Sequence, residues 1–184
     1  MWTFRGIPTL FYGSEIQFQA GMPVDGDPNK LALANSGRAY FGDKIEGSVT
    51  TADFGGYSNA TGAMATALNN PVAKHLSHMN KIRRAIPALQ KGQYSTDNID
   101  GTIAFKKRYT DDAKGIDSFV LVTISGGATF KGIPGGKYVD VVTGDAQMIT
   151  EGGSLTATCA GKGNLRIYVL NGTGKISGIS PYLK

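Results

Sequence analysis

The stretch Arg5-Gly6-Ile7-Pro8-Thr9-Leu10-Phe11-Tyr12-Gly13-Ser14-Glu15 lies near the start of the 184-residue chain. It is an apolar run bounded by Gly6 and Gly13, and it ends in the carboxylate of Glu15. A continuous apolar run of this kind is typical of a parallel strand that is buried on both faces of its sheet. Because only four residues precede the stretch, we expect the neighbouring strands to belong to a larger protein.

The residues that follow predict a long loop and then a helix. Residues 16–70 are rich in Gly, Asn, Ser, Asp and Ala and show little periodicity, as long functional loops do. Asn70 followed by Pro71 is typical of a helix start, with Asn as the cap and Pro in the first turn. We expect Pro87 to end this helix and its apolar stripe to pack on the strand that holds Leu10. The stripe consists of Val72, Leu76, Met79 and Ile82.

The C-terminal half changes to the periodicity of strands. Its alternating runs are separated by turns that contain Gly or Asp, with a spacing of roughly eight to twelve residues that is typical of an antiparallel sandwich with Greek-key connections. The predicted strands cover residues 102–109, 118–124, 137–142, 154–159 and 164–170. The large apolar residues expected in their core are Phe105, Phe119, Leu121, Tyr138, Val141, Leu155, Ile167 and Val169.

The charge of the chain does not favour a nucleic-acid partner. The formal net charge is +5 and the isoelectric point is about 9.3, but the basic residues are scattered. The only compact basic group is Lys81, Arg83 and Arg84, which on a helix most simply forms a solvated face. Because no nucleic-acid recognition motif accompanies this group, we expect no nucleic-acid binding.

The cysteines, histidines and apolar runs of the sequence argue against a disulfide-linked protein, a zinc protein and a membrane-spanning protein. Cys159 is the only cysteine, so an intrachain disulfide is impossible, and its alternating context predicts a small core side chain on a strand. His75 and His78 lie three residues apart without a third ligand at zinc spacing, so we expect no metal and no cofactor. No run reaches the ~20 apolar residues that span a membrane, and the first residues lack the pattern of an export signal.

Four further segments follow the opening stretch in order: Gly26-Asp27-Pro28-Asn29 and residues 36–43, 80–92 and 132–144. The opening stretch resembles the eighth barrel strand of the alpha-amylase superfamily of glycoside hydrolases, which commonly carries RGIP, an aromatic residue, YG, one residue and E. The later segments resemble, in turn, the substrate-proximal loop after that strand, a stretch seen in some bacterial members, the last barrel helix with its exit, and the C-terminal sandwich domain. Five motifs in family order make this resemblance specific over nearly the whole chain.

The resemblance implies an α+β chain that contains two parts of a larger enzyme. Residues 1–92 would be the C-terminal fragment of a (β/α)8 barrel, with strand 8, a long loop and helix 8. Residues 93–172 would be an antiparallel Greek-key β-sandwich, and residues 173–184 a linker or tail. The parent would be a hydrolase or transglycosylase, secreted or extracellular, that acts on α-1,4-glucans such as starch and maltooligosaccharides by a retaining mechanism. Its catalytic carboxylates end earlier barrel strands, and those motifs do not occur here, so the resemblance implies a chain without catalytic residues that is inactive alone.

The resemblance also assigns roles to particular residues. The structural motif at the barrel strand end would be Gly6, Pro8, Tyr12, Gly13 and Glu15. In the family this Glu holds loops by hydrogen bonds and does not act in catalysis. Asp27 matches a position that contacts sugar hydroxyls, and the Arg that follows it in relatives is replaced here by Lys30 and Leu31, which leaves Arg38 as the substitute. The implied partners are an α-glucan substrate, bound through the parent enzyme, and the missing N-terminal portion of the barrel.

Two other functions stay open at the level of sequence. The sandwich half could be a starch-binding module without catalysis that docks through exposed aromatic residues, and alternation does not assign all of them cleanly to core or surface. The candidate residues are Tyr94, Tyr109, Tyr138 and Tyr168. Alternatively, the chain could be an intact enzyme that uses Glu15 with Asp25 or Asp27. For Asp27 an ordinary turn is the simpler interpretation, because Asx-Pro pairs commonly form turns.

Overall fold

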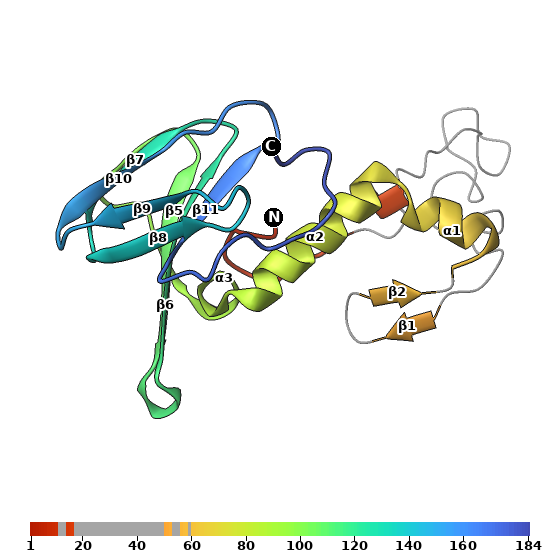
Figure 1. Cartoon of the computed structure of the whole chain (residues 1–184), viewed down its shortest axis with the longest axis horizontal. Coiled ribbons are helices and arrows are strands. Elements are labelled where there is room, and N and C mark those ends of the chain that lie inside the picture. The colour runs from red at the N-terminus through yellow and green to blue at the C-terminus, as the bar shows by residue number, and fades with distance from the viewer. Residues whose placement is uncertain (11–13, 17–49, 53–55, 59) are drawn as a thin grey trace, which may run out of the picture. The chain divides into compact units, whose positions relative to one another are not determined.

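The computed structural model describes residues 1–184 except 11–13, 17–49, 53–55 and 59 (Figure 1). The chain divides into two compact units. One comprises Met1–Ile7 together with Met79–Lys184, and we call it the sheet unit. The other comprises Pro8–His78, and we call it the intervening unit. The described elements make a mixed α+β chain whose sheets are antiparallel.

The intervening unit contains short elements and the first half of one longer helix. Its elements are the 3-10 helix η1 (Ser14–Ile16), the antiparallel hairpin of β1 (Thr50–Ala52) and β2 (Gly56–Ser58), the helix α1 (Gly62–Leu68) and the start of α2 (Pro71–Ala85). The Asn70 side-chain oxygen accepts a hydrogen bond from the Val72 backbone N–H at 2.9 Å. Asn70 therefore caps α2, and the predicted helix start is confirmed.

The strand predicted for residues 5–15 is wrong in the part of it that the structure describes. Residues 5–10 adopt bends and irregular backbone, and residues 14–16 form η1. Ile7 is 91% exposed and Leu10 is also exposed. A buried strand needs hydrogen-bonded neighbours, and no described strand pairs with residues 5–10. An apolar run such as this one becomes a buried strand only when other strands are present to pair with it.

The first residues are held against the second half of α2. The Arg83 guanidinium donates hydrogen bonds to the carbonyls of Trp2, at 2.7 Å, and Gly6, at 3.0 Å. The Trp2 indole N–H donates to the Asn80 side-chain oxygen. Lys81 is exposed, as a solvated face requires, but Arg83 is half-buried and serves as an anchor for the N-terminal segment. The prediction of a solvated basic face is therefore wrong for Arg83.

The sheet unit is built from nine strands in two antiparallel sheets (Figure 1). The six-stranded sheet has the order β3 (Gln93–Ser95), β5 (Ala104–Asp111), β6 (Ile116–Ile124), β11 (Leu165–Leu170), β8 (Gly136–Asp140) and β9 (Ala146–Ile149). The three-stranded sheet has the order β10 (Gly153–Ala157), β7 (Ala128–Ile133) and β4 (Ile99–Asp100). A short 3-10 helix, η2 (Asp112–Lys114), joins β5 to β6.

Five of these strands, β5, β6, β8, β10 and β11, confirm the predicted ones with shifted ends. The alternation of their side chains was strong enough to find them. Four strands were not predicted. β3 and β4 are only three and two residues long, and β7 and β9 contain Lys, Gly or Gln among their apolar residues. Their pairing with longer neighbours, and not their own pattern, makes them strands.

The space between the two sheets is filled by what we call the inter-sheet core. Phe130 and Leu155 from the three-stranded sheet and Leu121 and Tyr138 from the six-stranded sheet are completely buried in it. The remaining buried members are Phe119, Ala128, Ile133, Ala157 and Tyr168. Burial of a large apolar side chain contributes about 1.5–3 kcal/mol, so this core is sufficient to hold the two sheets together.

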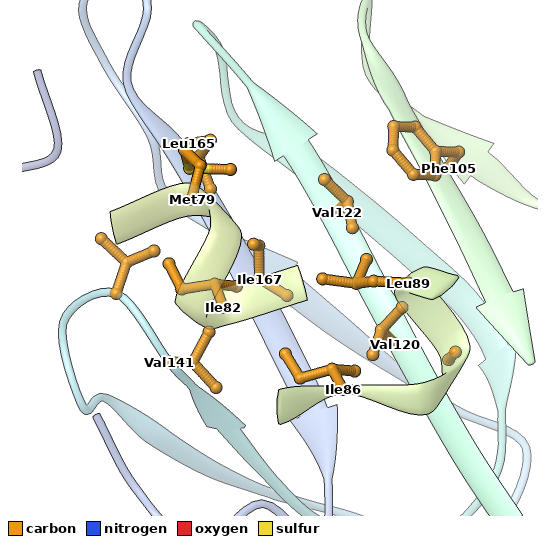
Figure 2. Close-up of a cluster of buried hydrophobic side chains, with 12 residues drawn as sticks. Met79, Ile82, Ile86, Leu89, Phe105, Val120, Val122, Val141, Leu165 and Ile167 are labelled. Atoms are coloured by element: carbon orange, nitrogen blue, oxygen red, sulfur yellow. The ribbon is translucent and has the colours of Figure 1, made fainter. Parts of the chain in front are cut away.

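The opposite face of the six-stranded sheet carries a second core, the helix-side core, beneath α2 and the short helix α3 (Pro87–Lys91). Figure 2 shows Ile82 of α2 beside Ile167, and Leu89 of α3 beside Val120 and Val122. The stripe of α2 therefore packs, through Met79 and Ile82, on this sheet and not on a strand holding Leu10. α2 ends at Ala85, and Pro87 opens α3, where its fixed φ and missing N–H suit the first turn.

Lys107 is a buried charge in the helix-side face of β5. It is 2% exposed, and its Nζ donates a hydrogen bond to the Leu89 carbonyl at 2.8 Å. Burial lowers the pKa of this ammonium, and the nearby positive charge of Arg83 lowers it further. The hydrogen bond compensates part of the desolvation cost and ties α3 to the sheet.

The last residues also pack on the sheet unit. Ile176 donates a backbone hydrogen bond to the Val141 carbonyl at 2.9 Å, and both Ile176 and Leu183 contact the helix-side core. The Lys184 N–H donates to the Asn164 side-chain oxygen at 3.1 Å. Within this structure, residues 173–184 are therefore a packed tail.

Candidate functional site

An open cavity of about 600 Å³ lies in the sheet unit. Four segments line it: Asp100, Gly101 and Thr102 after β4; residues 127–129 at the start of β7; residues 156–160 at the end of β10; and Arg166 of β11. Ligand sites commonly have volumes of roughly 300–1,000 Å³. The volume falls in this range, and the cavity is a broad depression that is open to solvent and not an enclosed pocket.

A row of polar side chains crosses the three-stranded sheet inside this cavity. In the strand register Asp100 lies opposite Thr129, and Thr129 lies opposite Thr156. The two threonine hydroxyl oxygens are 3.1 Å apart and share a hydrogen bond. Because side chains directly opposite on neighbouring strands stand on the same face, the row offers a carboxylate and two hydroxyl groups side by side.

Arg166 lines the cavity next to a buried carboxylate. Its Nε lies 3.7 Å from Oδ2 of Asp140, which is completely buried. Asp140 Oδ1 accepts hydrogen bonds from the backbone N–H groups of Val142, at 3.2 Å, and Ile167, at 2.9 Å. Its Oδ2 accepts from the N–H of Thr143, at 3.0 Å, and the hydroxyl of Thr143, at 2.6 Å. Both oxygens of this carboxylate therefore accept hydrogen bonds from within the fold, which indicates a structural role and not a catalytic one.

Asn164 connects Arg166 to the tail of the chain. Its side-chain oxygen accepts hydrogen bonds from Nη1 of Arg166, at 3.2 Å, and from the backbone N–H groups of Leu165, at 3.0 Å, and Lys184, at 3.1 Å. Its amide nitrogen donates to the Ala160 carbonyl at 3.0 Å. The buried Asn164 thereby fixes both Arg166 and the loop that forms one wall of the cavity.

Cys159 also lines the cavity but is not poised as a nucleophile. The residue is buried, as its sequence context predicted, although it lies two residues beyond the end of β10 and not on the strand. Burial raises the pKa of its thiol, and the nearby Arg166 charge only partly opposes this effect. A thiol with a raised pKa is a poor nucleophile because little thiolate is present at neutral pH.

Beside the cavity, Tyr168 and Asp145 form a short hydrogen bond. The Tyr168 hydroxyl donates to Oδ2 of Asp145 at 2.6 Å, and Gln147 donates to the same oxygen at 3.3 Å. The hydrogen bond from Tyr168, followed by that from Gln147, lowers the pKa of Asp145. Burial, followed by the contact with Asp145, raises the pKa of Tyr168. Both shifts favour the pair in which the carboxylate is charged and the phenol neutral.

Replacement of Tyr168 by phenylalanine is expected to raise the pKa of Asp145 toward its usual range, because the strongest donor to the carboxylate is lost. A pH titration followed by the ¹³C shift of the Asp145 carboxyl group measures this change. The folded-state pKa of Asp145 lies below an unfolded value of about 3.9, so the bond stabilises the fold above that pH and its contribution disappears as pH falls through the folded pKa. Tyr168→Phe should therefore destabilise the protein more at neutral pH than in acid.

The matched control is Tyr109→Phe, since the Tyr109 hydroxyl donates to Asp111 at 3.1 Å and makes no contact with Asp145. This control should leave the Asp145 titration unchanged. An Asp145 pKa that is the same in wild type and Tyr168→Phe would show that the hydrogen bond does not set it.

The structure describes only part of the set of site residues predicted from sequence. Gly6 lies in a bend with φ +90° and accepts a hydrogen bond from Arg83, Pro8 is half-buried, and Glu15 is a half-buried residue of η1. Tyr12, Gly13, Asp25, Asp27 and Arg38 lie outside the described residues. The substrate-binding role of Asp27 and Arg38 and the pairing of Glu15 with an aspartate therefore stay predictions.

The tyrosines proposed as an exposed sugar-binding surface do not form one. Tyr138 is completely buried, with its hydroxyl donating to the Pro134 carbonyl at 2.8 Å, and Tyr168 is 3% exposed. Both belong to the inter-sheet core, so in the alternative of a starch-binding module these two rings are not available as exposed docking residues. Tyr94 and Tyr109 are half-buried against the helix-side core, and the Tyr94 ring stacks on Phe105 with centroids 5.0 Å apart.

Metal-ligating side chains do not gather anywhere in the described part of the chain. No three residues among His, Cys, Asp and Glu lie close enough there to hold a metal ion. The described helices are also too short, or not apolar enough, to cross a membrane.

The cavity residues were not found from sequence because they come from separate segments. A local pattern exists only in the β10 segment, where Thr156 and Thr158 alternate with the buried Leu155 and Ala157. Comparison of the chain with protein-family models, with curated proteins and with solved structures gave no match.

Proposed function

We propose that this chain is the C-terminal part of an enzyme of the alpha-amylase superfamily, which acts on α-1,4-glucans by a retaining mechanism. The observation that carries the proposal is the ordered set of five motifs that begins with Arg5-Gly6-Ile7-Pro8 and ends with residues 132–144. The chain would supply the end of the barrel and a C-terminal Greek-key sandwich, and the catalytic carboxylates would come from the preceding part of the parent enzyme.

The order of elements is consistent with this proposal. In the described part of the chain, α2 and α3 are followed by nine strands in two antiparallel sheets. β11 is inserted between β6 and β8, so strands that are neighbours in space are not always successive in the chain. Such insertions characterise Greek-key connections, and the inter-sheet core matches what a sandwich requires.

Four of the described carboxylates are engaged by the fold, in keeping with the proposal that this chain is inactive alone. A retaining glycosidase needs two carboxyl groups about 5–5.5 Å apart, one as nucleophile and one as acid and base. Asp117 forms an ion pair with Arg108 at 2.6 Å. Asp111 forms one with Lys114 at 2.7 Å. Asp140 and Asp145 are engaged as described above. Each of these four carboxylates is held by an ion pair or a hydrogen bond that gives it a structural role.

Within the parent, residues 16–45 would form part of the rim of the sugar-binding cleft. Asp27 would accept hydrogen bonds from sugar hydroxyls, and Arg38 would hold its carboxylate in place, because a guanidinium next to a carboxylate fixes its orientation. The two-sheet domain would cover the apolar flank of the barrel.

The test is the coding sequence that precedes Met1, expressed in frame with the present chain. We expect the extended protein to release reducing sugar from starch and the 184-residue chain to release none. In the extended protein, Asp27→Asn should lower kcat/KM about tenfold or more, as the loss of a charged hydrogen bond to substrate predicts, while the exposed Asp112→Asn should leave it unchanged.

Turnover of starch by the 184-residue chain that disappears on Glu15→Gln would contradict the proposal and favour the intact-enzyme alternative. An extended protein whose added residues contain no barrel carboxylates would contradict it as well.

A further inference from the structure

We propose that the cavity lined by Asp100, Thr129, Thr156 and Arg166 binds a short neutral saccharide. Through this cavity the sheet unit itself would contact the glucan. The choice of an α-glucan as ligand rests on the function proposed above, whereas the presence of a site for a hydroxylated ligand rests on the cavity alone.

The hydrogen-bonding groups of the cavity favour a hydroxylated ligand. The Asp100 carboxylate and the hydroxyls of Thr102 and Thr158 make no hydrogen bond with any other residue that the structure describes. Thr129 and Thr156 bond to each other at 3.1 Å, which leaves further lone pairs and one donor for a ligand. Hydroxyl groups both donate and accept, and a carboxylate accepts strongly, so the lining complements sugar hydroxyls.

The charge of the cavity favours a neutral ligand over an anion. The positive charge of Arg166 already faces the buried Asp140 at 3.7 Å, and its Nη1 donates to the Leu165 carbonyl at 2.9 Å. The remaining charged group of the lining is Asp100, which is negative. An anionic ligand would meet this carboxylate without a free opposing charge, at an unfavourable Coulomb energy.

The backbone is closely packed at two positions of the cavity lining, Gly101 and Gly127. A Cβ at Gly101 would lie 2.6 Å from the Ala128 side chain, and a Cβ at Gly127 would lie 3.0 Å from the Ala157 carbonyl oxygen. The two glycines thus permit a close approach of backbone segments from β4, β7 and β10. Close packing at these two positions reduces the entropy cost of ordering them on binding.

Among the described residues that line the cavity, none carries an aromatic ring. Binding would therefore depend on hydrogen bonds and on contact between threonine methyl groups and sugar C–H groups, without ring stacking. Removal of hydroxyl groups should consequently have a large effect on affinity, and this provides the test.

The experiment is a titration of the ¹⁵N-labelled full chain with maltotriose, followed by two-dimensional NMR. We expect saturable shift changes at the amides of residues 100–102, 127–129 and 156–160. The double variant Thr129→Val/Thr156→Val keeps the side-chain shape and strand propensity but loses both hydroxyls, and should weaken binding about tenfold. Asp100→Asn, at an exposed position, should weaken it several-fold and provides a second reading if the double variant is poorly folded.

The matched control is Thr110→Val, an exposed threonine of β5 outside the cavity, which should bind as the wild type does. Shifts at the cavity that do not saturate, or that are equal with the acyclic polyol sorbitol, would overturn the inference. Saturable shifts confined to residues 16–45 would overturn it and leave the proposed function standing. Saturable binding at the cavity together with an inactive extended protein would support the inference and reject the proposed function.

Discussion

Replacing Asp140 with alanine is expected to lower the free energy of unfolding by about 3–5 kcal/mol, the usual cost of removing one partner from a buried ion pair. The completely buried carboxylate accepts four hydrogen bonds and faces Arg166 at 3.7 Å. Its loss leaves the backbone N–H groups of Val142, Thr143 and Ile167 without this acceptor, and the hydrogen bonds from Val142 and Ile167 are buried. Urea denaturation followed by circular dichroism measures the change.

The control for this substitution is Asp112→Ala, because Asp112 is exposed and its side chain makes no hydrogen bond with another described residue. Its effect should stay within about 0.5 kcal/mol. A loss below about 1 kcal/mol for Asp140→Ala would mean that water or a rearranged backbone replaces the carboxylate, and the structural role assigned to it would then be wrong.

Replacing Ile82 with alanine is expected to lower the free energy of unfolding by about 2–5 kcal/mol, the range for truncating a large buried aliphatic side chain. Ile82 is 0% exposed and lies in the helix-side core beside Ile167 and Val141 (Figure 2). The same denaturation experiment measures the loss. This substitution also tests whether the second half of α2 docks on the six-stranded sheet.

Lys81→Ala provides the comparison for Ile82→Ala, since it changes the adjacent, exposed position of the same helix. Alanine is a strong helix former, so the effect should be small. If Ile82→Ala were as mild as Lys81→Ala, the end of α2 would not be packed as described, and the stripe would have to bury itself elsewhere.

Local chemistry was the most predictable part of the fold. Asn70 identified the start of α2 because a side-chain cap acts within two residues of itself. Alternation identified β5, β6, β8, β10 and β11 because each is long enough to show a period. β4 has two residues and no readable period, so only its pairing with β7 makes it a strand.

Features that depend on distant partners could not be predicted. The run from Arg5 was predicted to be a buried strand because apolarity is a property of the segment, whereas burial requires neighbouring strands that the described residues do not provide. Tyr138 stands on the same face of its strand as Asp140, so alternation does not assign it to the core, and only the position of the second sheet shows that it is buried. The cavity joins four segments, from Asp100 to Arg166, and no local pattern relates them.

The buried ammonium of Lys107 gives the protein an internal chemical reporter. Amine-reactive reagents acylate lysines that solvent can reach, and Lys81, Lys91, Lys114 and Lys131 are all exposed. Lys107 is shielded by α3 and bonded to the Leu89 carbonyl, so it would react only when that helix separates from the sheet. The rate at which Lys107 is labelled, read by mass spectrometry of its peptide, would therefore measure how often this region opens under native conditions.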